Sequence, residues 1–441
     1  MTAVVGILNK RGVALAADSA VTRSRVYQGD RVKKITKNGN KLIRISEITP
    51  ISVMITGNAD FLRNPWDIII RRYRQERGDI PHSTVEACVH DLFDYISSNN
   101  ILWSSDVIGR WIESILDELF TEIDKKIQFG VKVCKEDETL AKPKTYIKTF
   151  ISLLRKKRGF ELKNGLCPHF EEYTIDLFRD YAKKILDLWF VDKTITKPYT
   201  AEVISGIREE LEMSLLTRLS TAGIEQDKSH KMDSHTKLVF AGYGVDQEYP
   251  SLVSTNVCGG FDNKVNYYIQ EKDVICISDD KPIAICPFAQ KDISVSIMRG
   301  IHIDWFRKIL NGLEDVSNSM IFDAFDDNEG GSREEFYRML KEVEYKDLMD
   351  KTSKSIKRQL FKNQRVWENK LKDCDLKTLA LLAEDMINLT CFQRIVTFQP
   401  EGVGGLVDVA VITKNDGFSW LNRKSWYHNK DVNGQYGKLG I

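Results

Sequence analysis

Residues 2–22 read TAVVGILNKRGVALAADSAVT, and this stretch decides the fold. Two short apolar runs, at 3–8 and 13–17, flank the polar residues 9–12. Apolar runs of this length, separated by a turn that ends in glycine, predict a hairpin of two well-buried strands.

A second pair of apolar segments repeats the pattern. KLIRIS at 41–46 and ISVMIT at 51–56 are separated by a turn that contains Pro50. We therefore expect a second hairpin. Four strands before any helix exclude the alternation of strand and helix that builds a parallel βαβ sheet.

Helical patterns begin after the second hairpin. Asn64 and Pro65 form a cap followed by a first-turn proline, so we expect a helix that ends near Gly78. STVE at 83–86 reads as a capping box for the next helix. From about 101 to 232 the apolar residues keep helical spacing, which predicts a large helical insertion.

Strand patterns then return, and a final helix and strand close the chain. The predicted strands are 237–242, 251–255, 265–270, 274–277, 283–286 and 407–413, and the predicted helices are 291–310 and 376–388. Runs of strands alternating with runs of helices are typical of an α+β fold, here with two stacked antiparallel sheets between helices.

The resulting organisation is a core interrupted twice. Its expected parts are residues 1–100 as the first part of the core, 101–232 as the helical insertion, 233–311 as the second part of the core, 312–372 as a second insertion with an acidic linker, and 373–441 as the last helix and strands of the core.

Composition indicates a water-soluble protein. The 441 residues carry a formal net charge of +1, with 42% hydrophobic and 29% charged residues, which favours neither nucleic acid nor an anionic membrane as a partner. No apolar run reaches the roughly 20 residues of a membrane span. The N-terminus lacks the pattern of a signal peptide, so we expect a cytoplasmic protein.

The cysteines and other metal-ligating residues predict no metal site and no cofactor. The eight cysteines are scattered and none forms a CxxC pair, which favours reduced, buried thiols. Cys167-Pro168-His169 lacks a second ligand pair at zinc spacing, and the acidic stretch 323–329 lacks the alternation of a calcium loop.

Thr2 is the first candidate for chemistry. If Met1 is removed, Thr2 offers a hydroxyl and an α-amine, whose usual pKa of about 7.7–8.0 suits a base that activates the hydroxyl. Asp18 follows a buried strand, and Lys34 begins a short apolar stretch. A lysine near Thr2 lowers the pKa of both groups, and a carboxylate near the lysine orients it. Gly57 ends a strand, where its N–H suits an oxyanion.

This pattern resembles the proteasome β-subunit and HslV-type threonine peptidases, a family of N-terminal-nucleophile hydrolases. The match runs without gaps from Thr2 to Lys34-Ile35 and continues at 56–59. LVFAGYGVDQEYPSL at 238–252 and GGLVDVAVIT at 404–413 resemble later elements of the family. The three pieces cover roughly 200 residues, outside both insertions.

The resemblance implies a four-layer αββα sandwich and a role for each residue. Thr2 is then the nucleophile and, through its amine, the base; Lys34 tunes Thr2, Asp18 orients Lys34, and Gly57 donates to the oxyanion. By the same resemblance, Ser19 and Thr22 line a substrate strand that pairs with the peptide backbone.

The sequence departs from the family at two supporting positions. The stretch 284–288, AICPF, has no serine where the family's catalytic subunits carry one, and PEGVGG at 400–405 lacks the family's Asp-x-x-Ser. Glu401 is the candidate auxiliary acid. These losses leave the reaction rate open.

Three functions remain open at this stage. The first is a peptidase, a homo-oligomer that resembles the ring-forming relatives and works with an ATPase or other regulatory partner. The second is a small-amide or self-processing hydrolase whose site is covered by the insertion at 101–232. The third is a catalytically impaired scaffold, which retention of Met1 would favour because a blocked threonine amine is no base.

Overall fold

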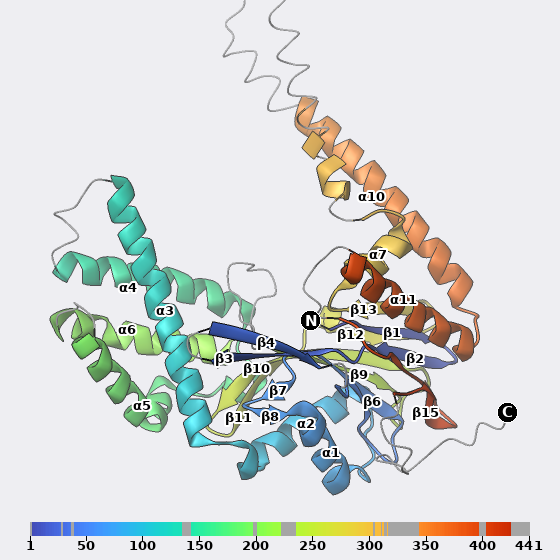
Figure 1. Ribbon diagram of the computed structural model, residues 1–441, viewed down its shortest axis with the longest axis horizontal. Coiled ribbons are helices and arrows are strands. Elements are labelled where there is room, and N and C mark those ends of the chain that lie inside the picture. The colour runs from blue at the N-terminus through green and yellow to red at the C-terminus, as the bar shows by residue number, and fades with distance from the viewer. Residues whose placement is uncertain are drawn as a thin grey trace, which may run out of the picture.

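The computed structural model describes residues 2–27, 30–36, 39–134, 143–196, 201–221, 235–302, 305–309, 311–312, 315, 344–396 and 403–424. Within these residues the chain is an α+β protein with two antiparallel sheets. Helices lie on the far side of each sheet, and a separate group of helices extends from one end of the molecule (Figure 1).

The first sheet contains the N-terminal hairpin. Among the described residues it has five strands, in the spatial order β13 (Ile283–Phe288), β1 (Val4–Asn9), β2 (Gly12–Ala17), β14 (Asp408–Thr413) and β15 (Gly417–Asn422). The predicted hairpin is confirmed, with Val4 opposite Ala17 and Asn9 opposite Gly12. β1 and β2 are buried at every position. β15 was not predicted, and its side chains are at most half-buried, so its pattern in the sequence is weak.

The second sheet contains the second predicted hairpin. In the described part of the chain its main path is β11 (Lys264–Tyr268), β10 (Ser251–Phe261), β9 (Thr236–Gly242), β6 (Ile51–Gly57) and β5 (Leu42–Arg44), with β12 (Val274–Cys276) also paired to β10. β5 and β6 pair antiparallel, as predicted from the apolar runs around Pro50.

Three groups of buried side chains hold the sheets and their helices together. Side chains from both sheets share one cluster, in which Gly6 of β1 lies against Leu252 of β10. The other face of the first sheet packs against α11 (Leu376–Val396). The other face of the second sheet packs against α1 (Trp66–Arg77) and α2 (Val85–Ser98). Figure 1 shows α7 and α11 beside the first sheet and α1 and α2 beside the second.

The starts of α1 and α2 correct the predicted caps by one residue each. Pro65 is the N-cap of α1, rather than its first helical residue. Thr84, rather than Ser83, is the N-cap of α2, where its hydroxyl accepts a hydrogen bond from Ala87 N–H at 3.0 Å. A threonine hydroxyl satisfies one of the unpaired donors at a helix start.

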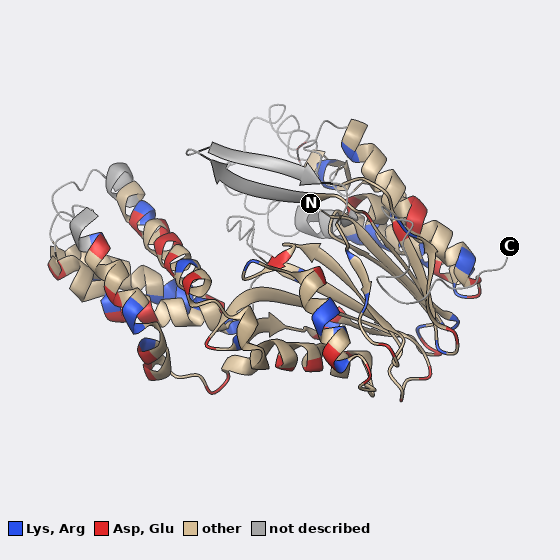
Figure 2. Cartoon of the chain, turned by 60° about the horizontal axis from the view of Figure 1, so that its bottom comes forward, with Lys and Arg blue, Asp and Glu red and all other residues tan. Residues whose placement is uncertain are grey.

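In the described parts of the predicted insertion there are four long helices: α3 (Ser105–Cys134), α4 (Pro143–Glu161), α5 (Ile175–Thr196) and α6 (Ala201–Ser220). They share a cluster of buried apolar residues of their own. Short 3-10 turns adjoin them and the sheets at Asn100–Leu102, Leu162–Asn164, Pro168–Phe170 and Glu271–Asp273. Charged residues of both signs lie along these helices, whereas the strands carry few (Figure 2).

A glycine in β10 lets the insertion approach the second sheet. Gly259 has φ +120°, and a Cβ there would lie 2.6 Å from the Trp111 ring of α3. Any side chain at Gly259 would displace this ring. The insertion is therefore packed directly onto the sheet.

Other elements differ from the predictions. β3 (Val21–Tyr27) and β4 (Asp30–Thr36) form a two-stranded ribbon that was not predicted, and β7 (Asp60–Phe61) pairs with β8 (Asn64–Pro65). The helix predicted at 291–310 is interrupted: α7 (Lys291–Arg299) ends at Gly300, which takes φ +80°, and residues 305–309 are helical again.

The second predicted insertion contains α10 (Glu344–Leu371), and its acidic linker at 323–332 lies outside the described residues. α10 runs away from the sheets beyond α7 in Figure 1. In the parts that the structure describes, none of the helices combines the length and apolar character needed to cross a membrane.

Candidate active site

Thr2 lies two residues before the start of β1, and it lines a cavity. Its side chain is only 6% exposed, and it lines the cavity together with Thr56 and Gly57 at the end of β6. The next residue is fixed by Asp18, because Ala3 N–H donates to Asp18 Oδ1 at 2.9 Å and Asp18 N–H donates to the Ala3 carbonyl at 3.1 Å. The start of the first strand is therefore held by the end of the second.

Asp18 is fully buried, and both oxygens of its carboxylate accept hydrogen bonds. Oδ1 accepts from Lys41 Nζ at 2.7 Å as well as from Ala3. Oδ2 accepts from Gly404 N–H at 3.0 Å and from Ala20 N–H at 3.3 Å. A buried charge needs such partners. Asp18 thus joins the N-terminal segment to the chain that leads into β14.

Among the described side chains, the lysine that pairs with Asp18 is Lys41, whereas the proposed contact between Asp18 and Lys34 stays a prediction. Lys34 lies in β4, with its backbone opposite Arg23 of β3, and its side chain lies outside the described residues. Lys41 directly precedes β5 and is 5% exposed. Lys41 lies seven residues beyond Lys34, so the gapless match from Thr2 to Lys34-Ile35 does not reach it.

Burial controls the protonation of Lys41. Desolvation lowers the pKa of its ammonium, and the Asp18 carboxylate opposes that shift by attracting the charged form. A second ammonium, on Lys424, lowers the pKa of Lys41 further. The two lysines, each with its carboxylate partner, therefore lie close together.

The second pair, Lys424 and Asp408, was not identified from the sequence. Lys424 Nζ lies 2.7 Å from Asp408 Oδ2, both side chains are buried, and Nζ also donates to the Gly39 carbonyl. Lys424 N–H donates to Asp408 Oδ1 at 2.9 Å. This pair ties the second residue after β15 to the segment just before Lys41. Its only sequence signal is a charged residue inside the apolar strand VDVAVIT.

Gly57 adopts a backbone conformation that requires glycine. Its φ is +84°, and a Cβ there would lie 2.5 Å from the His235 carbonyl oxygen. Since Gly57 also lines the cavity with Thr2, its backbone is accessible to a bound molecule without an intervening side chain.

None of the remaining predicted residues has a described side chain that lines the cavity. Ser19 is fully buried, its hydroxyl donates to the Leu406 carbonyl at 2.8 Å, and it does not line the cavity. Thr22 pairs through its backbone with Ile35 in the β3–β4 ribbon, and its side chain lies outside the described residues. Glu401 also lies outside them.

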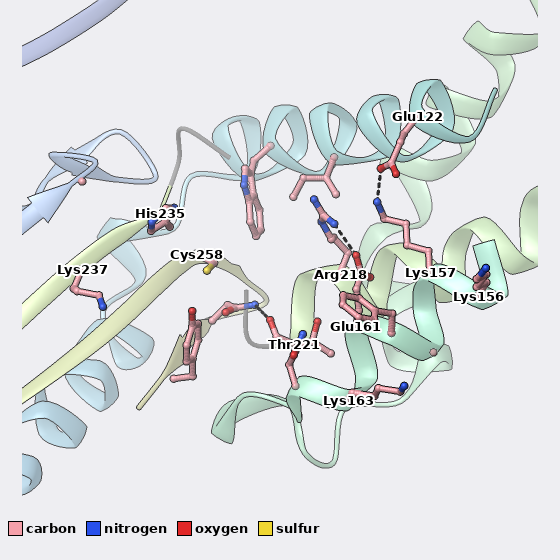
Figure 3. A pocket seen from close by; sticks show the side chains of 18 of the residues that line it. Glu122, Lys156, Lys157, Glu161, Lys163, Arg218, Thr221, His235, Lys237 and Cys258 are labelled. Carbon is pink, nitrogen blue, oxygen red and sulfur yellow. Dashed lines mark hydrogen bonds and ion pairs between the residues drawn. The ribbon is translucent and has the colours of Figure 1, made fainter. Parts of the chain in front are cut away.

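The cavity has a volume of about 1310 Å³, with one wall from the core and one from the helical insertion. Figure 3 shows Lys237, His235 and Cys258 on the strands, opposite the helices of the insertion. The insertion residues that line it were not predicted as site residues; they include Trp111, Glu122, Lys156, Lys157, Glu161, Lys163, Arg218 and Thr221.

The charges of the Asp18–Lys41 pair also affect the pKa of one thiol. Burial raises the pKa of Cys391, on α11, to about 11, and the Asp18 charge adds to the rise. Such a thiol remains protonated at neutral pH and is a poor nucleophile. Cys391 also does not line the cavity, whereas Thr2 does, so Thr2 is a better candidate than Cys391 for attack on a substrate. Within the described residues no group of three acidic, histidine or cysteine side chains is placed to hold a metal ion.

Comparison with known proteins adds no relative. No protein-family model matches the sequence, and a search of curated proteins finds no significant match.

Proposed function

We propose that this protein is an N-terminal threonine hydrolase of the proteasome β-subunit and HslV type, which cleaves peptide bonds with Thr2. The observation that carries the proposal is the position of Thr2. It lines a large cavity, and the residue after it is hydrogen-bonded to a buried aspartate–lysine pair. The resemblance predicts a threonine, an aspartate and a lysine at the site, although it gives the role of the lysine to Lys34 and not to Lys41.

The arrangement of the core supports the same proposal. Each sheet contributes one face to a shared apolar cluster and the other face to a cluster with helices. We infer a four-layer αββα sandwich, in which Thr2 lies at the cavity end of the first strand.

In the proposed reaction, removal of Met1 frees the α-amine of Thr2. The amine accepts the hydroxyl proton while Oγ1 attacks the amide carbonyl of the substrate. The C–N bond then breaks, the leaving amine takes a proton, and an ester to Thr2 remains. Water, activated by the same amine, hydrolyses the ester and restores the hydroxyl.

Lys41 and Gly57 assist this reaction electrostatically. The Lys41 ammonium, held by Asp18, lowers the pKa of the Thr2 groups through its positive charge. The Gly57 N–H stabilises the negative oxygen that develops on the carbonyl. Asp18 acts on Lys41 and on the backbone at Ala3, so it is a positioning residue.

The insertion favours a restricted substrate, which keeps a small-amide hydrolase as the second candidate. Helices α3, α4 and α6 line the same cavity as Thr2. A folded protein cannot enter such a cavity, so we propose unfolded or short peptides, delivered by an ATPase or other regulatory partner when the source is a folded protein.

We also propose that the protein forms a homo-oligomer. The outer face of α11 exposes several large apolar side chains, at Leu381, Leu389, Phe392, Ile395 and Val396. Contiguous exposed apolar residues of this kind mark interaction surfaces.

Intact mass spectrometry of the purified protein, before and after a threonine-directed electrophile, tests the proposal. We expect a mass that lacks Met1 and a single adduct, which the Thr2→Ala variant fails to form. Peptide cleavage by the Thr2→Ala variant at the wild-type rate would refute the proposal. Retention of Met1 in an otherwise native protein would instead support the non-catalytic scaffold.

A further inference from the structure

The wall of the cavity carries an excess of positive charge. Among the described residues that line it, there are seven lysines and arginines but only two glutamates. Most of these cations come from the helical insertion, which lines the same cavity as Thr2. The resemblance that points to Thr2 does not extend to these residues.

Both glutamates of the wall are already neutralised. Glu122 pairs with Lys126 at 2.7 Å and also with Lys157 (Figure 3). Glu161 pairs with Arg218 at 2.6 Å. The Glu122 carboxylate thus pairs with two lysines, so the wall retains a net positive charge after the ion pairs within it are counted.

Two lysines of the wall have no carboxylate partner in the described structure. Lys156 is the exposed neighbour of Lys157 on α4, and Lys163 follows the helix in the turn Leu162–Asn164. Neither forms an ion pair with any described residue, whereas Arg155 beside them pairs with Glu210 at 2.8 Å. These two ammonium groups are available to a ligand.

The size of the cavity indicates the kind of anion. Its volume of about 1310 Å³ exceeds the roughly 300–1,000 Å³ of ordinary small-molecule pockets. Such a space holds several residues of an extended chain. A peptide with its scissile bond near Thr2 would extend past the insertion wall, where its side chains meet Lys156 and Lys163.

We propose that the insertion makes this cavity selective for acidic peptide segments, which bind with their carboxylates at Lys156 and Lys163. The inference rests on the proposed function, because that function makes the ligand a peptide with its scissile bond near Thr2. The selectivity itself concerns binding and does not require cleavage. The wall excludes basic segments by repulsion and accepts acidic ones by attraction.

Binding of labelled peptides to the Thr2→Ala variant tests the inference without turnover. Fluorescence anisotropy compares a glutamate-containing peptide with the same peptide in which glutamine replaces each glutamate. We expect the acidic peptide to bind about tenfold more tightly, which corresponds to two partly exposed ion pairs. The preference should fall towards unity at about 1 M salt, where the screening length is about 3 Å.

Charge reversal locates the preference. Adding Lys156→Glu and Lys163→Glu to Thr2→Ala should abolish or invert it. The matched control adds Lys144→Glu and Lys148→Glu, two exposed residues of α4 that do not line the cavity, and should keep it. Equal binding of the two peptides, or equal loss with both double variants, would overturn the inference.

The same peptides separate this inference from the proposed function. Cleavage of both peptides at equal rates by the wild-type protein, with equal binding, removes the acidic selectivity and leaves the threonine hydrolase standing. Selective binding that Lys156→Glu and Lys163→Glu abolish, in a protein that cleaves neither peptide, keeps the acidic selectivity and removes the hydrolase.

Discussion

Replacing Lys41 by methionine is the sharpest test of the proposed site. Methionine retains most of the length of the lysine side chain but removes the charge that contacts Asp18 at 2.7 Å. Because Asp18 is fully buried, its carboxylate would be left without a cationic partner. Removing one partner of a buried pair costs about 3–5 kcal/mol.

The hydrogen bonds of Asp18 place the expected loss at the low end of that range. Three backbone N–H groups, from Ala3, Ala20 and Gly404, still solvate the carboxylate when the lysine is absent. We therefore expect Lys41→Met to lower the free energy of unfolding by about 3 kcal/mol, roughly a hundredfold in the folding equilibrium. The urea midpoint of a circular-dichroism transition measures the change.

A matched control separates this loss from the removal of any lysine or arginine charge. Arg71 pairs with Asp67 at 3.5 Å on the surface of α1, and both side chains are partly exposed. Arg71→Met should cost at most about 0.5 kcal/mol. An equal effect of Lys41→Met and Arg71→Met on the urea midpoint would refute the buried pair.

The activity of the same variant tests which lysine serves Thr2. Lys41→Met should abolish adduct formation at Thr2 under conditions where the protein remains folded. Lys34→Met should retain it, because Asp18 contacts Lys41 instead. Loss of the adduct in Lys34→Met, with retention in Lys41→Met, would restore the assignment made from sequence spacing.

Three further predictions concern a backbone conformation, a thiol and the attachment of the insertion. Gly57→Ala should cost at least about 2 kcal/mol more than Gly417→Ala, because both positions have positive φ but only Gly57 lacks room for a Cβ; thermal unfolding measures the difference. At pH 8, Cys391 should react with iodoacetamide about a hundredfold more slowly in the native protein than in urea, because its pKa rises from 9.0 to about 11 on folding. The same shift stabilises the fold fully below pH 9 and is lost as pH rises towards 11. Gly259→Ala should displace the Trp111 ring and speed proteolysis between the core and the insertion.

The sequence predicts the two central hairpins correctly because their signal is local. Every residue of β1 and β2 is buried, so each strand reads as an uninterrupted apolar run. β3 and β4 were missed because arginines and lysines interrupt their apolar residues, as in VTRSRVY and DRVKKIT. The sequence therefore reveals the buried strands better than the ribbon between them.

The missed ribbon also explains why Lys41 was not identified from the sequence. A gapless count from Asp18 ends at Lys34, but residues 21–36 turn back on themselves in the ribbon. Lys41 comes seven residues after Lys34, beyond the end of β4, and directly precedes β5. Asp18 was identified because it ends a strand, whereas its partner depends on how many residues the ribbon takes up.

Local sequence patterns could not predict which residues of the insertion line the cavity with Thr2. Arg218 of α6 joins Glu161 of α4 at 2.6 Å and Glu118 of α3 at 2.9 Å, across sequence separations of 57 and 100 residues. These contacts fix three helices against one another, and Trp111 fixes α3 against the sheet at Gly259. The core motif thus determines the proposed chemistry, while the position of the insertion determines what reaches Thr2. Substitutions in the wall should therefore change the choice of peptide and leave the reaction of Thr2 with a small electrophile intact.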